Sequence, residues 1–250
     1  MRIRVSVGDA STTPLNFKGH LELFTKGIAQ ATSDGSQVLV MLELFVSGYG
    51  CEDYFFYPQI IAKAFARLKE MALLVPKDFL AIVGCPISFE GKLYNAAAYL
   101  SAGQVQGLTF KQNLANHGLH YEGRWFSAWE RNIEASLEIA PGQRVPCGDV
   151  TIDFGGIVFG AEICEDMWIS DRPIKSLVAR GAQVVANLSA SHFELGKDKL
   201  RNKLISSSSL EYGVPYLYSN IVGNEAGRII YDGGSAISAS GEILAQGISC

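Results

Sequence analysis

Three residues with complementary chemistry each stand directly after an apolar, strand-like run of the sequence: Glu43, Lys111 and Cys164. A free thiol is mostly protonated at neutral pH, so a cysteine becomes a strong nucleophile only where a base takes its proton and a cation stabilises the thiolate. Glu43 can serve as the base, and the ammonium of Lys111 can stabilise both the thiolate and an oxyanion. Together the three residue types predict acyl transfer through a thioester on Cys164.

The sequence around Cys164 suits a nucleophile held in a tight turn. An apolar run at 157–163 precedes it and a predicted helix at 172–180 follows it, a context analogous to a nucleophile elbow. The backbone N–H of Glu165, directly after the nucleophile, is a natural second donor to an oxyanion. A simpler interpretation stays open, because a lone cysteine after an apolar strand is more often an inert buried side chain, and charged residues at strand ends are usually solvated.

The elements that must position these residues alternate between strand-like and helix-like segments. Apolar runs predict strands at 2–8, 37–43, 79–85, 157–163, 183–188 and 215–220. Helix-like segments are predicted over 17–31, 61–72, 172–180 and 199–211. Uninterrupted apolar strands between helices are typical of sheets covered by helices, and ligands bind such sheets beyond the carboxyl ends of the strands. We therefore expect the three reactive residues to meet at one edge.

Two hairpins and one long loop complete the predicted order of elements. Strands at 93–100 and 104–110 are predicted to form a hairpin, and a last hairpin joins 229–231 to 235–245. The stretch at 112–148 is predicted as irregular structure. A loop of that length in a compact domain is usually functional or a lid.

The composition of the 250 residues argues against several classes of protein. A net charge of −4 without a basic tract argues against nucleic-acid binding. No apolar run approaches the ~20 residues of a membrane span, and no secretory signal is present. Five widely spaced cysteines without a Cys-x-x-Cys pair argue against a disulfide framework or a zinc site and favour a cytoplasmic location. With 48% hydrophobic residues and no linker, one domain over 1–250 is expected.

Five sequence segments resemble, in the same order, segments of the nitrilase superfamily of carbon–nitrogen hydrolases, in particular the glutamine-amidase domain of glutamine-dependent NAD synthetases. They are LELFVSGY at 42–49 followed by Asp53, FKQNL at 110–114, GAEICEDMW at 160–168, NLSASHFELGK at 187–197 and DGGS at 232–235. The resemblance covers about residues 2–245. It implies a four-layer α-β-β-α sandwich, whereas the pattern of elements alone predicts an α/β fold with helix-covered sheets.

The resemblance also implies a role for each reactive residue. Glu43 would be the base, Lys111 the cation that stabilises thiolate and oxyanion, and Cys164 the nucleophile. A second active-site glutamate, which orients the lysine and the substrate amide in the family, falls on Glu122. An ion pair of Glu122 with Arg124 is the alternative interpretation of that residue.

Three further residues are implied to contact the substrate. Ser191 and Lys197 fall where the family contacts the amino-acid end of glutamine, and a cation at Lys197 would suit an α-carboxylate. His117 stands where the family has a tyrosine that touches the substrate. For Ser191 and Lys197 an ordinary loop or helix cap is the alternative interpretation.

The sequence departs from the family pattern near these residues. Leu42 stands where the family has a proline before the glutamate, Ala115 and His117 replace a proline and a tyrosine, and His192 replaces another proline. None of these changes removes a predicted catalytic group. They bear on which amide the site accepts.

The function implied by the resemblance is hydrolysis of a carboxamide C–N bond, with glutamine giving glutamate and ammonia and with no cofactor. The pair His117 and His120 lacks a third metal ligand close by, so no metal site is expected. The ammonia would supply NAD synthesis by an ATP-dependent synthetase domain or subunit, whose Ser-Gly-Gly phosphate motif these residues lack. A homo-oligomer is also expected. Two alternatives stay open: a stand-alone amidase or nitrilase-like hydrolase of another small ω-amide, and a non-catalytic module that assembles a synthetase.

Overall fold

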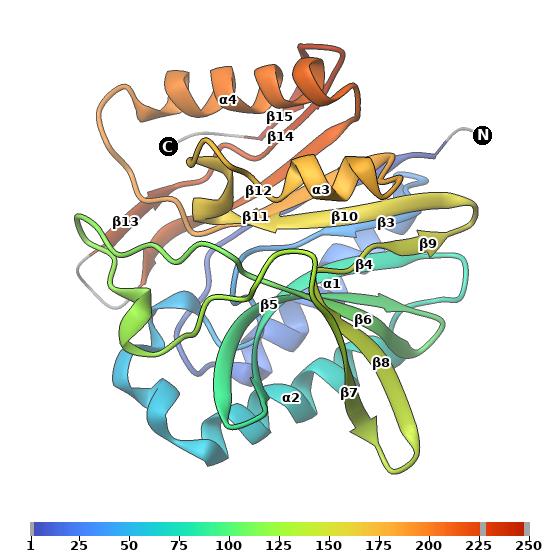
Figure 1. Cartoon of the computed structure of the whole chain (residues 1–250), viewed down its shortest axis with the longest axis vertical. Helices are drawn as coiled ribbons and strands as arrows, with labels where there is room; N and C mark the ends of the chain where they lie inside the picture. Colours follow the sequence, from blue (N-terminus) through green and yellow to red (C-terminus); the bar gives the residue numbers. More distant parts are fainter. Residues whose placement is uncertain (1–2, 226–228, 248–250) are drawn as a thin grey trace.

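Two β-sheets lie face to face at the centre of the molecule (Figure 1). The computed structural model describes residues 3–225 and 229–247. The first sheet has seven strands in the order β1-β3-β4-β5-β6-β8-β7. These strands are β1 (Val5–Val7), β3 (Val38–Val40), β4 (Leu80–Phe89), β5 (Lys92–Ser101), β6 (Gln104–Phe110), β7 (Glu134–Ala140) and β8 (Gln143–Gly148).

The second sheet consists of the C-terminal strands together with β2. Its order is β15-β14-β12-β11-β10-β9, with β2 and β13 also paired to β12. The strands are β2 (Asp9–Ala10), β9 (Ile152–Phe154), β10 (Ile157–Ile163), β11 (Val184–Ser189), β12 (Tyr216–Glu225), β13 (Ile229–Asp232), β14 (Ala236–Ala239) and β15 (Glu242–Gln246). Because β10, β11 and β12 are parallel, their carboxyl ends lie at the same edge of the sheet.

Helices cover the outer face of each sheet (Figure 1). The helices α1 (Phe17–Ser33) and α2 (Pro58–Leu73) pack on the first sheet, and α3 (Ile174–Ala179) and α4 (Lys197–Tyr212) pack on the second. The predicted four-layer α-β-β-α sandwich is therefore confirmed. In the described part of the chain, no helix is both long and apolar enough to cross a membrane.

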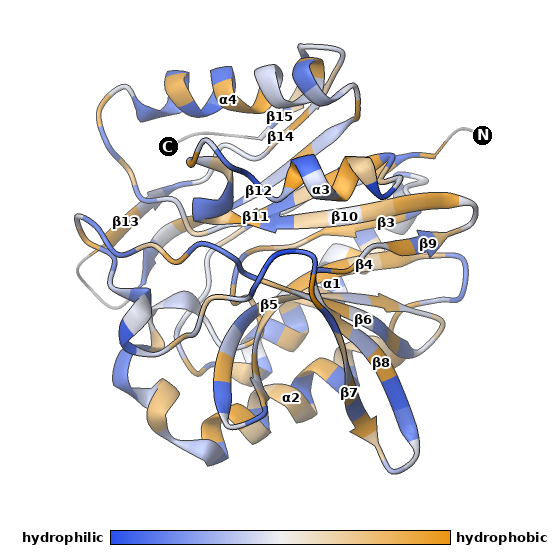
Figure 2. Cartoon of the chain, viewed as in Figure 1, coloured by the Kyte–Doolittle hydropathy of each residue, from blue (hydrophilic) through white to orange (hydrophobic). Residues whose placement is uncertain are grey.

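The alternation of side chains along the strands explains these layers. On β3, Val38 and Val40 lie in the core between the two sheets, whereas Leu39 faces the core under α1 and α2. On β11, Ala186 faces the core between the sheets and Val185 faces α3 and α4. Both faces of these strands are covered, which is why their sequences are uninterrupted apolar runs; Figure 2 shows β4 and β10 in hydrophobic colours.

The stretch at 112–148, predicted as irregular, contains the hairpin of β7 and β8. Residues along β7 alternate between exposed and partly buried, and Pro141 and Gly142 occupy the turn between the strands. The prediction of irregular structure is therefore wrong here, although the Pro-Gly pair is a strong turn signal in the sequence.

The last predicted hairpin is also wrong in its pairing. The strand β13 pairs with β12, not with the segment at 235–245. That segment instead forms its own hairpin, β14 with β15, and β14 pairs with β12. Gly233 and Gly234, with φ of 66° and 76°, turn the chain between β13 and β14.

Candidate active site

Glu43 lies in a tight turn after β3, and a glycine on β4 makes room for that turn. The chain passes through Leu44 with φ of 49°, in the left-handed region. Gly84 packs directly against the turn: a Cβ there would lie 2.3 Å from Leu42 O and 2.3 Å from Leu44 N. Glycine is therefore required at the point where the strand meets the turn. The Glu43 side chain is fully buried.

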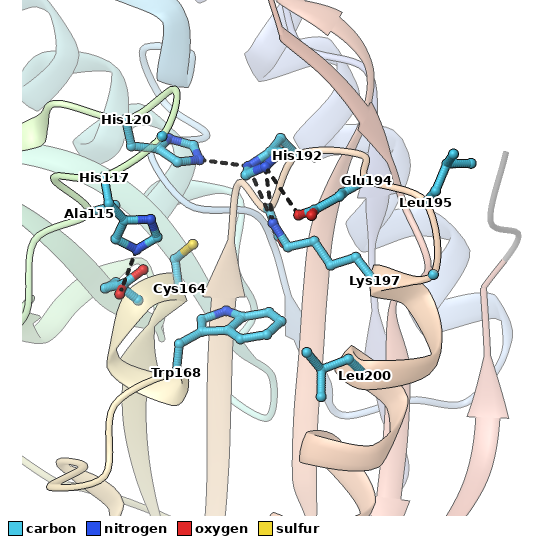
Figure 3. Close-up of a pocket in the computed structure, with 14 residues that line it drawn as sticks. Ala115, His117, His120, Cys164, Trp168, His192, Glu194, Leu195, Lys197 and Leu200 are labelled. Atoms are coloured by element: carbon cyan, nitrogen blue, oxygen red, sulfur yellow. Dashed lines mark hydrogen bonds and ion pairs between the residues drawn. The ribbon is translucent and has the colours of Figure 1, made fainter.

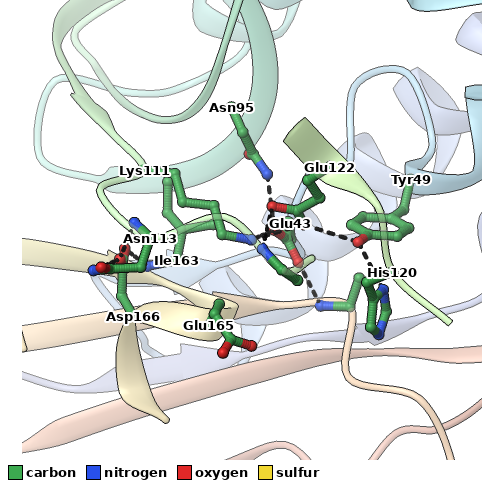
Figure 4. A network of polar contacts seen from close by, with 12 residues as sticks. Glu43, Tyr49, Asn95, Lys111, Asn113, His120, Glu122, Ile163, Glu165 and Asp166 are labelled. Carbon is green, nitrogen blue, oxygen red and sulfur yellow. Dashed lines mark hydrogen bonds and ion pairs between the residues drawn. The ribbon is translucent and has the colours of Figure 1, made fainter. Parts of the chain in front are cut away.

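Lys111 begins the loop after β6 and lies between two carboxylates. Its Nζ donates to Glu43 Oε1 at 2.6 Å and to Glu122 Oε1 at 2.8 Å (Figure 4). Neither Lys111 nor Glu43 has any exposed side-chain surface. The predicted alternative for Glu122 is not observed, because Arg124 pairs with Asp53 instead, at 2.7 and 2.8 Å.

The carboxylate of Glu43 is held from both sheets. Asn95 Nδ2 on β5 donates to Glu43 Oε1 at 2.8 Å, and Ala190 N, directly after β11, donates to Glu43 Oε2 at 2.9 Å. Burial raises the pKa of the Cys164 thiol, and the backbone of Ala190 acts on it in the opposite direction, so Ala190 lies beside Cys164 as well as Glu43. Glu43 and Cys164 thus lie against a common backbone donor at the interface between the sheets.

Cys164 stands at the end of β10, where the short 3-10 helix Cys164–Met167 begins. Its φ is 46°, an unfavourable left-handed conformation for a residue with a Cβ. Such strain at a residue between strand and helix resembles a nucleophile elbow and clusters at functional sites. The predicted strand–turn context of Cys164 is therefore present.

Asp166 fixes the turn that carries Cys164. Its Oδ2 accepts from Ile163 N at 3.0 Å, and its Oδ1 accepts from Asn113 N at 2.9 Å and from Asn113 Nδ2 at 2.8 Å (Figure 4). Asn113 lies two residues after Lys111, so this carboxylate ties the nucleophile turn to the lysine loop. Burial, with the nearby Glu162 charge, raises the pKa of Asp166 to about 7.

The protonation states of the three reactive residues follow from burial and from their mutual charges. Burial raises the pKa of Glu43 to about 7, although Lys111 acts in the opposite direction. Burial alone would lower the pKa of Lys111, but Glu122 and Glu43 raise it well above its ordinary value, so the ammonium persists. Burial and the Glu43 charge raise the pKa of the Cys164 thiol, which is therefore protonated at rest.

A cavity of about 420 Å³ opens at the sulfur of Cys164 (Figure 3). Its walls include Glu165, Trp168, Ser191, His192 and Lys197. Ser191 is buried beside the cavity, and its backbone is fixed by Asn220, whose Oδ1 accepts from Ser191 N at 2.8 Å. The predicted substrate-contact residues Ser191 and Lys197 therefore share one cavity with Cys164.

Lys197 is the first residue of α4 and directs its ammonium into this cavity. Its Nζ lies 3.3 Å from each ring nitrogen of His192 and 5.5 Å from the centroid of the Trp168 ring. Burial lowers the pKa of Lys197. An ammonium whose nearest contacts are an imidazole and an indole has room for an anionic partner in the cavity.

His117 lies at the exposed rim of the cavity. Its side chain is 70% exposed, and its Nε2 lies 3.1 Å from Glu165 Oε1. The Glu165 carboxylate is thereby paired with a residue at the rim, and the role of its backbone N–H as an oxyanion donor stays a prediction. His117 lines the cavity at its rim, and its contact with a substrate stays a prediction.

Several partners of the buried groups were not identified from the sequence. Asn95 could have been identified from the sequence, because it is an amide within the apolar stretch of a strand, and a buried amide needs a hydrogen-bond partner. Tyr49 donates to Glu122 Oε1 at 2.8 Å, and its place in the segment 42–49, which contains Glu43, is the only signal of this contact in the sequence. Ala190 contributes only its backbone N–H, which leaves no mark in the sequence.

No group of three or more His, Cys, Asp or Glu side chains within residues 3–225 and 229–247 is placed to hold a metal ion. His117 contacts Glu165 instead. His120 contacts Tyr49 and His192.

The fold is that of the carbon–nitrogen hydrolases. The family model described as "Carbon-nitrogen hydrolase" matches residues 4–249, and the chain belongs to that family.

Among individual proteins, the chain is similar to glutamine-dependent NAD(+) synthetases. It is 32% identical to the enzyme of Oryza sativa subsp. indica over 254 residues, which cover 98% of this chain and 35% of that protein. The crystal structure of a glutamine-dependent NAD(+) synthetase from Cytophaga hutchinsonii matches with a TM-score of 0.91 and 33% identity, over 99% of this chain and 40% of the other. The chain thus spans about a third of the length of the curated relatives it matches.

A shorter protein shares the fold. An amidase from Nesterenkonia sp. matches with a TM-score of 0.80 and 22% identity, over 100% of this chain and 89% of the other. The comparisons together confirm the nitrilase-like architecture and the resemblance to NAD synthetases.

Proposed function

We propose that this chain hydrolyses the carboxamide C–N bond of glutamine, giving glutamate and ammonia through a thioester on Cys164. The observation that carries the proposal is the buried group of Glu43, Lys111 and Glu122 beside a strained cysteine at the base of a cavity. A buried ion pair of this kind seldom stabilises a fold, so its place next to a nucleophile favours a chemical role.

The first half of the reaction forms the thioester. The Cys164 sulfur attacks the amide carbon while its proton passes to Glu43. The Lys111 ammonium and the Glu165 backbone N–H stabilise the tetrahedral oxyanion. When the C–N bond breaks, Glu43 returns the proton to the departing nitrogen, and ammonia leaves.

The second half releases the acid. A water molecule attacks the thioester carbon while Glu43 takes its proton, and a second tetrahedral oxyanion forms against the same donors. The C–S bond then breaks and the sulfur regains its proton from Glu43. A carboxyl group with a pKa of about 7 suits both halves, because it can accept and return a proton near neutral pH.

The cavity supports an amino-acid amide as the substrate. The Lys197 ammonium would bind the α-carboxylate, Ser191 would contact the same end of the substrate, and His117 would contact it at the rim. Glu122 would orient Lys111 and the substrate amide. The relatives named glutamine-dependent NAD(+) synthetases favour glutamine as that amide.

The destination of the ammonia follows from the same relatives. In this proposal the chain is one hydrolase domain, residues 1–250, that supplies ammonia to an ATP-dependent NAD synthetase domain or subunit. It works in the cytoplasm as a homo-oligomer and requires no cofactor for the amidase reaction. Relatives that are named glutamine-dependent NAD(+) synthetases support this destination of the ammonia.

A second candidate is an amidase for another small ω-amide. His192 and His117 favour it, because these residues depart from the family pattern and both border the cavity. Such an enzyme would keep Glu43, Lys111 and Cys164 but make different use of Ser191 and Lys197.

The test is ammonia release by the purified chain from glutamine, asparagine, simple aliphatic amides and a nitrile. Glutamine should be preferred, and mass spectrometry of a rapidly quenched reaction should show an acyl group on Cys164. Cys164→Ala should release no ammonia while unfolding at the same denaturant concentration as the parent. Ammonia release that survives Cys164→Ala would refute the proposal, and preference for another amide would establish the second candidate.

A further inference from the structure

Two histidines connect the cavity wall to the buried carboxylate of Glu122. His120 Nδ1 lies 2.9 Å from the hydroxyl of Tyr49, and His120 Nε2 lies 2.9 Å from His192 Nδ1. Tyr49 in turn donates to Glu122 Oε1 at 2.8 Å, and the Lys197 ammonium lies 3.3 Å from His192. An unbroken series of contacts therefore runs from the cavity to the partner of Lys111.

The residues of this series come from separate parts of the chain. Tyr49 begins the 3-10 segment Tyr49–Phe56, His120 belongs to the loop after Lys111, and His192 follows β11. His120 is 8% exposed, and its ring centroid lies 5.8 Å from that of Tyr49 and 5.0 Å from that of His192. The contacts of His120 with Tyr49 and His192 are thus formed by packed side chains inside the protein.

Hydrogen counting fixes the direction of every bond in the series. The hydroxyl of Tyr49 gives its hydrogen to a carboxylate oxygen, so its oxygen must accept from His120 Nδ1–H. A neutral imidazole has one N–H, so His120 Nε2 is an acceptor and His192 Nδ1–H must donate to it. The Lys197 ammonium lies 3.3 Å from both ring nitrogens of His192, and of the two only Nε2, which lies 3.9 Å from Glu194 Oε2, is then left to accept from it.

We propose that His120 and His192 are positioning residues. Their neutral rings link Lys197 to Tyr49 by hydrogen bonds that all run in one direction, and Tyr49 in turn holds Glu122 against Lys111. Burial lowers the pKa of His120 to about 3 and also lowers that of His192, which keeps both rings neutral as the series requires. Neither histidine touches the reacting atoms. Both act through Tyr49 and Glu122 on the orientation of Lys111.

The kinetic part of this inference rests on the proposed amidase function, but the hydrogen positions do not. Both rings should carry their hydrogen on Nδ1. Nitrogen-15 spectra of the imidazoles report that hydrogen directly, and the sequence has only four histidines, so single variants assign every signal. His20 is an internal reference, because its Nε2 accepts from Thr13 N and its Nδ1 faces Val46 O.

The spectroscopic test uses the whole chain at neutral pH. His120 and His192 should both be neutral and protonated on Nδ1, and Tyr49→Phe, which removes the acceptor of His120 Nδ1–H, should shift the nitrogen-15 signal of that nitrogen. The signal of His20 should not change. A hydrogen on Nε2 of His120 in the parent protein, or a charged ring, would overturn the proposal whether or not the protein hydrolyses glutamine.

The kinetic test is a double-mutant cycle between His120 and Tyr49. His120→Phe and Tyr49→Phe should each lower kcat roughly tenfold or more with little change in KM, because each breaks the support of a charged group. His120→Asn, whose amide can replace the Nδ1–H, should recover part of the loss. In the Tyr49→Phe background, His120→Phe should cause no further loss.

The matched control is Tyr99→Phe, which removes another buried phenolic hydroxyl, one that contacts Thr109 Oγ1 at 3.0 Å. It should lower stability but leave kcat unchanged. If the losses in kcat multiply in the double variant, or if His120→Phe changes only KM, the proposed positioning role of the two histidines is wrong. The two proposals can fail separately. If the parent protein releases no ammonia from any amide, yet both rings carry hydrogen on Nδ1 and Tyr49→Phe shifts the His120 signal, the proposed function is refuted and the series of hydrogen bonds is confirmed.

Discussion

Lys111 Nζ lies 2.6 Å from Glu43 Oε1, although the two residues are 68 positions apart and neither side chain touches solvent. Bringing both charges out of water costs more than a surface pair would, and their attraction offsets much of that cost only while both are present. The pair also shares its lysine with Glu122. The stability of the fold and the chemistry of the site therefore depend on the same ammonium.

Replacing Lys111 by Met should remove activity and destabilise the protein by about 3–5 kcal/mol, the range for a buried charge that has lost its partner. Two carboxylates, Glu43 and Glu122, would then remain buried without a cation. Urea unfolding at pH 7.5 measures the loss. The double variant Lys111→Met with Glu43→Gln should be more stable than Lys111→Met alone. If the second change makes the protein less stable still, the charge argument is wrong.

The pH dependence of kcat/KM should have an acidic limb near pH 7. Glu43 must be ionised to take the proton of Cys164, and its pKa is raised to about 7, so activity should increase as pH rises through that value. Asn95 stabilises the ionised form with its hydrogen bond. Asn95→Leu should consequently move the limb to higher pH, and a limb that stays fixed or moves to lower pH would contradict the assignment of Glu43 as the base.

The same raised pKa predicts an opposite trend for stability. A carboxyl group that binds its proton more tightly in the folded state contributes most below its unfolded pKa, near 4.5, and this contribution is lost as pH rises through about 7. The urea midpoints of the parent and of Glu43→Gln can be compared from pH 5 to pH 8. The midpoint of the parent should fall relative to that of the variant as pH increases. A difference that is constant, or that changes sign in the other direction, would show that Lys111 holds Glu43 ionised throughout.

Gly84→Ala should impair activity without touching any reactive side chain. Its new methyl group would lie 2.3 Å from backbone atoms of Leu42 and Leu44, so the turn carrying Glu43 must shift. Overpacking of this kind costs about 1–3 kcal/mol of stability. The drop in kcat should be larger than this loss of stability alone would cause, because the base is displaced from its position. Gly91→Ala is a control, because Gly91 has a φ of 76° but open space around it. Equal effects on kcat from both variants would argue against a steric cause.

The positions of the reactive residues could be predicted from the sequence because each depends only on where a strand ends. Glu43, Lys111 and Cys164 each follow an apolar run, and the carboxyl ends of such strands form a ligand edge. Which strands lie side by side is not local, so the contacts of Glu43 with Asn95 and Ala190 had to come from the structure.

The errors in the fold have the same origin. The strand β13 was correctly placed in sequence but given the wrong partner, because β12 is long enough to pair with β14 over one part and with β13 over another. The hairpin of β7 and β8 was missed although polar and apolar residues alternate along Glu134–Ala140, a pattern typical of a half-buried strand, because neither strand is an uninterrupted apolar run. The strand β7 is the edge strand of the first sheet, and every second residue along most of it is exposed, so polar residues are tolerated there.

Glu43 and Lys111 are carried by the first sheet, while Cys164 and Ala190 follow strands of the second. The nucleophile and its base are thus delivered by opposite halves of the sandwich. A polypeptide in which each half has formed but the halves have not yet stacked would hold only an ordinary, unactivated thiol. Cys164 would then become reactive only when the two sheets stack during refolding. The rate at which its reactivity appears would therefore measure the rate of that stacking step.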